Sequence, residues 1–341
     1  MKTDETILAA APPRLFPTLL NGFNTVAGQI HLIIIPVVVD LLLWLGPKLR
    51  IHDLFSPFIA DITKSMARVS PEEMLSTVNM SSELWTEFLE QFNLLTAIRT
   101  IPIGVPSLIA RLSPMTSPLA YNPVLETPSL RVGIAVLGLL LMVGFFLGAV
   151  YFNSLARYSV SEREKFSWNR LFKQYTQSLV FFLILVAILI AVSVPMLIIV
   201  SLLGLISLGL AQFVLMGFAF LILWGILPLI FSPHGIFTLE QRVVPSMLIS
   251  LRLVRFFLPG TGFFIMFSVL ISEGLNMLWM LPGSDSWLTL LGIGGHAFVV
   301  TALTAASFKY YREGLRWMQF NIQKMAEARM KQENGGSTIE Q

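Results

Sequence analysis

A run of 66 residues, from Gln174 to Leu239, contains no Asp, Glu, Lys or Arg, and it constrains the fold more than any other feature of the chain. A helix needs about 20 apolar residues to cross the hydrocarbon core of a bilayer. The run is therefore too long for one crossing and has the right length for two. We predict a polytopic membrane protein.

The composition points the same way. Hydrophobic residues make up 55% of the chain and charged residues 13%, whereas soluble domains contain about 25% charged residues. The Lys and Arg residues behind the net charge of +3 stand in clusters beside apolar segments. This placement is typical of membrane orientation and not of nucleic-acid binding, so we expect the lipid bilayer as a partner and no nucleic acid.

Hydropathy predicts an all-α fold with about six transmembrane helices. We place them at residues 25–45, 132–152, 178–202, 207–230, 261–281 and 287–307. The N-terminal segment 1–24, the loops 153–177 and 231–260 and the tail 308–341 then share one side of the membrane. Basic residues concentrate in the two loops and the tail, so the positive-inside rule makes that side cytoplasmic. We expect a bacterial-type plasma (inner) membrane with both termini in the cytoplasm.

The segment 46–131 is predicted to lie on the opposite side as a helical and Pro-rich insertion. Ser70 to Glu73 has the pattern of a helix start, with a capping box. In a second helix at 82–100, an apolar stripe lies opposite three Glu residues and should be buried; it consists of Leu84, Phe88, Phe92 and Leu95.

Six prolines between Pro102 and Pro128 exclude regular helix over most of that stretch. Residues 101–112 are nevertheless apolar apart from Arg111. We interpret them as lying on the outer bilayer surface or packed over the bundle. A Pro-rich connector folded on the preceding helices is an equal alternative.

Aromatic and basic residues alternate in two cytoplasmic stretches, which is the composition that the headgroup region favours. We expect these stretches to anchor at the inner leaflet, and specific binding of an anionic lipid is the alternative. The candidate headgroup contacts are Arg163, Lys165, Arg170, Lys173, Arg312 and Arg316.

Ionisable side chains inside spans are costly and are therefore candidates for function. Glu273 and His296 stand about equally far from the turn that joins the last two spans, so we expect them to face each other near the bilayer centre. Asn276 shares the helix face of Glu273. A carboxylate beside an imidazole could relay protons or coordinate a cation; alternatively, the two groups satisfy each other and fix the helix register.

The first span contains His31 and Asp40, which are nine residues apart and form no obvious common site. Asp40 precedes Trp44 near the predicted outer interface. We expect its carboxylate to reach lipid headgroups or polar groups of the loop.

Enzyme motifs do not emerge. The chain has no cysteine, and its four histidines show neither an HExxH pattern nor another metal-ligand spacing. A P-loop and a GxSxG elbow are also missing. We therefore predict no catalytic residue, no metal site and no cofactor.

Residues 223–278 resemble, in arrangement, the membrane domain attached to some bacterial glycerophosphodiester phosphodiesterases. The matching positions are Trp224, Pro228, Phe231, Glu240, Ser246, Ser250, Leu253 and Arg255. The resemblance implies a membrane module without an established activity. The phosphodiesterase barrel itself is missing from the sequence, so no catalytic residue carries over.

The sequence thus favours a non-enzymatic scaffold or accessory subunit of an envelope or transport system, with a membrane protein as partner. The alternative is a small proton- or cation-coupled transporter or channel that uses Glu273 and His296. A lipid-modifying membrane enzyme has less support.

Overall fold

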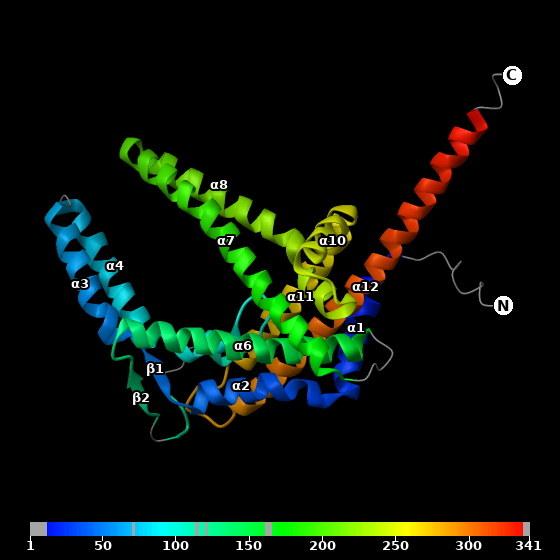
Figure 1. Cartoon of the computed structure of the whole chain (residues 1–341). Helices are drawn as coiled ribbons and strands as arrows, with labels where there is room; N and C mark the ends of the chain where they lie inside the picture. The colour runs from blue at the N-terminus through cyan, green and yellow to red at the C-terminus, as the bar shows by residue number, and fades with distance from the viewer. Residues whose placement is uncertain (1–11, 70–71, 113–115, 120–121, 161–165, 337–341) are drawn as a thin grey trace. The chain divides into compact units, whose positions relative to one another are not determined.

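The structure, a computed structural model, describes residues 12–69, 72–112, 116–119, 122–160 and 166–336 (Figure 1). These residues form α-helices almost throughout, and the predicted all-α polytopic fold is confirmed. The helices are α1 (Leu15–Gly28), α2 (Ile34–Leu45), α3 (His52–Val69), α4 (Glu72–Gln91), α5 (Ile109–Leu112), α6 (Leu130–Ser159), α7 (Trp168–Ile206), α8 (Leu208–Ile226), α9 (Ser232–Leu239), α10 (Val243–Phe256), α11 (Leu258–Trp279) and α12 (Thr289–Gly336). Short 3₁₀ turns are η1 (Ile30–Ile33), η2 (Leu94–Arg99) and η3 (Leu227–Leu229).

Five helical segments of the described chain are long and apolar enough to cross a membrane. They coincide with the last five predicted spans: α6, α7, the segment from α8 to Leu239, α11 and α12. A sixth crossing is obtained if α1 and the η1–α2 segment are taken together. The helix predicted to begin at Thr25 starts instead at Leu15 and is interrupted at Gln29.

The chain divides into two compact units, and three of the long helices contribute to both. The first unit contains residues 1–29, 153–269 and 302–341. Its core includes His234 of α9, which is surrounded by the ring of Phe231 just before α9 and by the rings of Phe308 and Tyr311 in α12. Small residues also bring α1 close to α12, because a β-carbon at Gly22 would lie 2.3 Å from the carbonyl oxygen of Ala302.

Helices α7 and α8 of this unit form an antiparallel hairpin (Figure 1). Ser207 ends α7 and also begins α8, where its hydroxyl accepts a hydrogen bond from the Leu210 N–H at 3.4 Å. In each of these two spans, the apolar window of 18 consecutive residues contains no buried residue. In α12, 61% of the corresponding window is buried. Most of the hairpin therefore packs on nothing but itself within the described chain.

The loop expected at 231–260 is mostly helical. It contains α9 and α10, which pack on each other. Ser232 to Phe237 are all buried, so this segment belongs to the core of the first unit.

The second unit contains residues 30–152 and 270–301. A two-stranded parallel sheet closes its insertion, with β1 (Lys48–Arg50) paired to β2 (Val124–Glu126). Helices α3 and α4 pack on each other as a hairpin. The predicted helix start at Ser70 and Pro71 lies outside the described residues.

The apolar stripe of the insertion is not buried as predicted. α4 runs without a break from Glu72 to Gln91, so the expected boundary at Ser82 falls inside it. Leu84 and Phe88 are 61% and 51% exposed. The helix turns a neighbouring face toward α3 instead, centred on Trp85 and Leu89.

The apolar stretch 101–112 lies inside the second unit. Ile103, Val105, Leu108 and Ile109 are each at most 1% exposed. α6 receives the stretch at a Gly-x-x-x-Gly pattern: a β-carbon at Gly144 would lie 2.3 Å from the Ile98 carbonyl oxygen, and one at Gly148 would lie 2.8 Å from that of Ile103. The stretch therefore packs on the helices of the second unit, and its place relative to the bilayer surface stays a prediction.

Candidate functional site

Polar side chains of α2, η2, α11 and α12 gather around the buried stretch 101–112 in the second unit, which itself contributes Ser107 and Arg111. The stretch is irregular up to Ser107 and ends in the short helix α5. Irregular backbone at membrane depth is tolerated where protein buries it and satisfies its polar groups. We call this set the polar cluster; it consists of Asp40, Arg99, Ser107, Arg111, Glu273, Asn276 and His296.

Asp40 of α2 provides the acceptors for the start of α5. Its carboxylate accepts the Ser107 hydroxyl and the backbone N–H groups of Leu108 and Ile109, the latter two at 3.1 Å. Ser107 Oγ in turn accepts the N–H of Ala110 at 3.0 Å. The carboxylate thus satisfies donors that a helix start leaves free. Of the two predicted partners of Asp40, the loop is the one that it contacts.

Glu273 of α11 pairs with Arg111 of α5. Two parallel bonds join the guanidinium to the carboxylate, Nη1 to Oε2 at 2.6 Å and Nη2 to Oε1 at 2.7 Å. This bidentate geometry is the strong form of an Arg–carboxylate pair. It raises the pKa of Arg111 above its ordinary value, so the guanidinium stays charged.

His296 of α12 contacts Asn276 of α11, with 2.8 Å between Nδ1 and Oδ1. Both side chains are 3% exposed. When Nδ1 donates to the amide oxygen, the lone pair of the imidazole lies on Nε2. Nε2 is buried and has no hydrogen-bond partner among the described residues.

Glycines on α12 allow the close approach of α11 beside this contact. A β-carbon at Gly292 would lie 2.4 Å from the Trp279 carbonyl oxygen, and one at Gly295 would lie 2.7 Å from the Trp279 ring. The helices therefore meet backbone to backbone, as small residues allow in membranes.

The polar residues predicted inside the spans do not form one site; they take part in separate contacts. Glu273 and His296 share the cluster, but Glu273 bonds to Arg111 and His296 to Asn276. Asp40 joins the cluster from α2, whereas His31 is exposed in η1. Among the described residues, no three His, Asp or Glu side chains come together as metal ligands.

Sequence reasoning missed the two arginines and Ser107. Arg99 of η2 lies near both Asp40 and Arg111, and burial together with the charge of Arg111 lowers its pKa. A usable signal was present, since Arg99 shortly precedes the apolar stretch 101–112 and Arg111 lies within it, where a cation would need a partner.

His234 was also missed because it falls in a predicted loop. It lies in α9, with 2.7 Å between its Nε2 and Ser307 Oγ. The rings of Phe231, Phe308 and Tyr311 surround it, the closest centroid at 4.5 Å. His234 is a core residue of the first unit.

The candidate headgroup contacts divide into three groups. Arg170 forms an ion pair with Glu240 at 2.7 Å, and Arg312 donates to the Val160 carbonyl oxygen at 3.0 Å. Lys173 and Arg316 are exposed. Arg163 and Lys165 lie outside the described residues.

No protein-family model, curated protein or solved structure matches this chain. The resemblance of residues 223–278 to a phosphodiesterase membrane domain therefore stays a prediction.

Proposed function

We propose that the chain is a non-enzymatic membrane scaffold or accessory subunit that binds a partner membrane protein through the α7–α8 hairpin. One observation carries this proposal: the most apolar windows of both spans contain no buried residue, while α6, α11 and α12 bury part of theirs. Lipid provides no hydrophobic drive for helix association, so spans are held by close packing. A hairpin that adds so little to its own bundle has its sides free for another protein.

Small residues on α8 fit such a role. β-carbons at Gly217 and Gly225 would meet no atom within 4 Å. Positions of this kind let a neighbouring helix approach closely. The polar cluster has a different role in this proposal: its hydrogen bonds and ion pair hold the helices of the second unit together.

The test is photo-crosslinking of the full chain in native membranes from positions on α8, followed by mass spectrometry and native-mass measurement of the complex. We expect one stoichiometric membrane-protein partner and its loss in Gly217→Leu and Gly225→Leu. Gly138→Leu in α6 is the matched control, because a β-carbon there also meets open space. Migration of the wild type as a lone monomer, or equal loss with all three variants, would reject the proposal.

A second candidate, a proton- or cation-coupled transporter, is favoured by the buried Nε2 of His296. This atom is an acceptor without a partner in the described chain, and the Arg111–Glu273 pair belongs to the same cluster. Flux in proteoliposomes should then depend on pH and fall in His296→Asn and Glu273→Gln. His31→Asn, at the exposed histidine, is the control. Unchanged flux in the two cluster variants rejects this function.

We also propose the topology expected from the basic loops, with both termini in the cytoplasm of a plasma membrane. Single-cysteine labelling tests it directly, since the chain has no cysteine. A cysteine at Ser284 should react from outside, and one at Gln323 from the cytoplasm. The reverse pattern overturns the topology.

A further inference from the structure

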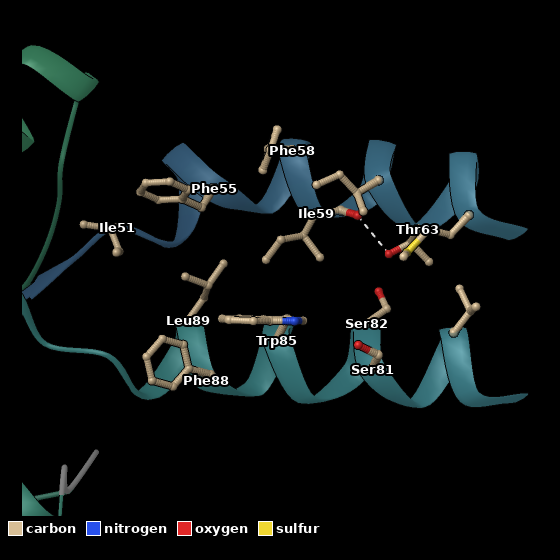
Figure 2. A pocket seen from close by; sticks show the side chains of 13 residues that line it. Ile51, Phe55, Phe58, Ile59, Thr63, Ser81, Ser82, Trp85, Phe88 and Leu89 are labelled. Carbon is tan, nitrogen blue, oxygen red and sulfur yellow. Dashed lines mark hydrogen bonds between the residues drawn. The ribbon is translucent and has the colours of Figure 1, made fainter. Parts of the chain in front are cut away.

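The α3–α4 hairpin encloses an apolar slot with a volume of about 470 Å³ (Figure 2). Phe55 and Ile59 come from α3, and Trp85 and Leu89 come from α4; Ile59, Trp85 and Leu89 point into the space between the helices. All thirteen lining residues are uncharged. The volume lies within the range of about 300–1,000 Å³ that ligand pockets occupy.

The few polar groups of the lining leave the slot apolar. Thr63 directs its hydroxyl to the carbonyl oxygen of Ile59 in its own helix, at 2.8 Å (Figure 2). Ser81 and Ser82 stand opposite on α4 and are small. The lining therefore suits an uncharged, flexible apolar group.

The dimensions of the slot define the shape of its occupant. Its lining runs from Phe55 to Met66 on α3 and from Val78 to Leu89 on α4, which is about 17 Å of helix on either side. With Ile51 the slot is about 20 Å long. A helix of that length, about 10–12 Å wide with its side chains, would need roughly 1,500 Å³ or more and does not fit. A chain one carbon wide does, since carbon atoms pack at about 4 Å.

The charge of the hairpin limits which lipid can supply that chain. α3 contains two acidic and two basic residues, and α4 contains five acidic residues and no basic one. These charges lie outside the lining. An excess of acidic groups repels a free fatty-acid carboxylate and an anionic headgroup, but it tolerates a zwitterionic one.

We propose that the α3–α4 slot binds one acyl chain of a zwitterionic phospholipid. The chain enters along the open side of the hairpin, where Phe58, Trp85 and Phe88 are each more than half exposed. Its methylene groups replace water or detergent along the inner faces of both helices. The site is independent of the α7–α8 hairpin and of the polar cluster.

The experiment uses the full chain in phosphatidylcholine nanodiscs that contain a trace of phosphatidylcholine with a photoactivatable diazirine in one acyl chain. After irradiation, peptide mapping should place the adducts on slot-lining residues of α3 and α4. Ser82→Phe fills the slot and should reduce labelling about tenfold, the effect of removing contacts to about two methylene groups. Ser76→Phe, on the opposite face of α4, is the matched control and should label like the wild type.

A second pair keeps the test valid if Ser82→Phe fails to fold, as judged by helix content. Thr63→Phe fills the slot from α3, and Ala60→Phe is its control on the outer face. Equal labelling of slot and control variants indicates boundary lipid only and overturns the proposal. Stronger labelling by a diazirine fatty acid or by phosphatidylglycerol overturns the zwitterionic phospholipid as the source. Protein–protein crosslinks at the slot, without lipid adducts, overturn the acyl chain itself.

Discussion

The α7–α8 hairpin and the polar cluster around α5 satisfy their polar groups in opposite ways. From Gln174 to the end of α8 at Ile226 the hairpin contains no Asp, Glu, Lys or Arg, and its backbone groups bond within each helix. The cluster contains irregular backbone and ionisable side chains, so each group needs a specific partner from elsewhere in the second unit. The difference shows that apolar composition determines which segments are suited to the membrane, whereas specific polar contacts determine how the segments pack together.

The largest expected effect is that of Asp40→Ala. The substitution leaves the Ser107 hydroxyl and the N–H groups of Leu108 and Ile109 without their acceptor, at about 1–3 kcal/mol for each buried donor. We expect the free energy of unfolding, measured by steric trapping in bicelles, to fall by about 3–5 kcal/mol. Asp40→Asn retains an acceptor and should cost less. A stable alanine variant would show that the cap of α5 contributes little to the fold.

A smaller loss is expected where α6 receives the buried stretch. Gly144→Ala forces a β-carbon against the Ile98 carbonyl oxygen and should destabilise the chain by about 1–3 kcal/mol. Gly138→Ala in the same helix meets open space and should be neutral or stabilising, since alanine favours helix over glycine by about 1 kcal/mol. Equal thermal shifts for both variants in detergent would contradict the close approach at Gly144.

The Arg111–Glu273 pair should contribute less again, because its two side chains are 38% and 47% exposed. A double-mutant cycle with Arg111→Gln and Glu273→Gln should give a coupling energy of about 1 kcal/mol or less. A coupling of several kcal/mol would instead place the pair among the main determinants of the second unit.

The buried Lys48 in β1 should make the stability of the folded chain depend on pH. Burial lowers its pKa below the ordinary 10.5, and its ammonium group donates to the Leu43 carbonyl oxygen at 2.7 Å. The unfolded chain therefore binds this proton more tightly than the folded chain does, so stability should rise as the pH increases from the lowered pKa toward 10.5. Thermal melts of Lys48→Met should lack this rise; if they show it too, another group is responsible.

The smallest effect on stability is expected in the α7–α8 hairpin. Leu205→Ala and Phe213→Ala change side chains that are 85% and 68% exposed, and each should alter the free energy of unfolding of the isolated chain by no more than about 0.5 kcal/mol. Binding of the proposed partner should fall in the same variants. Destabilisation comparable to that of Gly144→Ala would remove the contrast between the two regions.

The sequence was sufficient to predict an all-α fold with five long apolar helices, because long apolar runs allow few other folds. It also indicated that Glu273, Asn276 and His296 belong together, since a short turn joins α11 and α12. It could not reveal that Arg111 is the partner of Glu273 or that Ser107 meets Asp40. Those contacts join residues that are far apart in the chain, and no periodicity reports them. The prediction of which face of α4 is buried was wrong, because two apolar faces adjoin on that helix.

The contact between Asp40 and the start of α5 also has a consequence for biosynthesis. Its partners follow it by 67 to 69 residues. At a synthesis rate of about 5–20 residues per second, α2 exists for about 3–14 s before they have been made. During that interval the insertion machinery handles a span with an unpaired carboxylate, which disfavours its partition into lipid. The carboxylate of Asp40 in α2 can therefore gain these hydrogen-bond partners only after residues 107–109 have been synthesised.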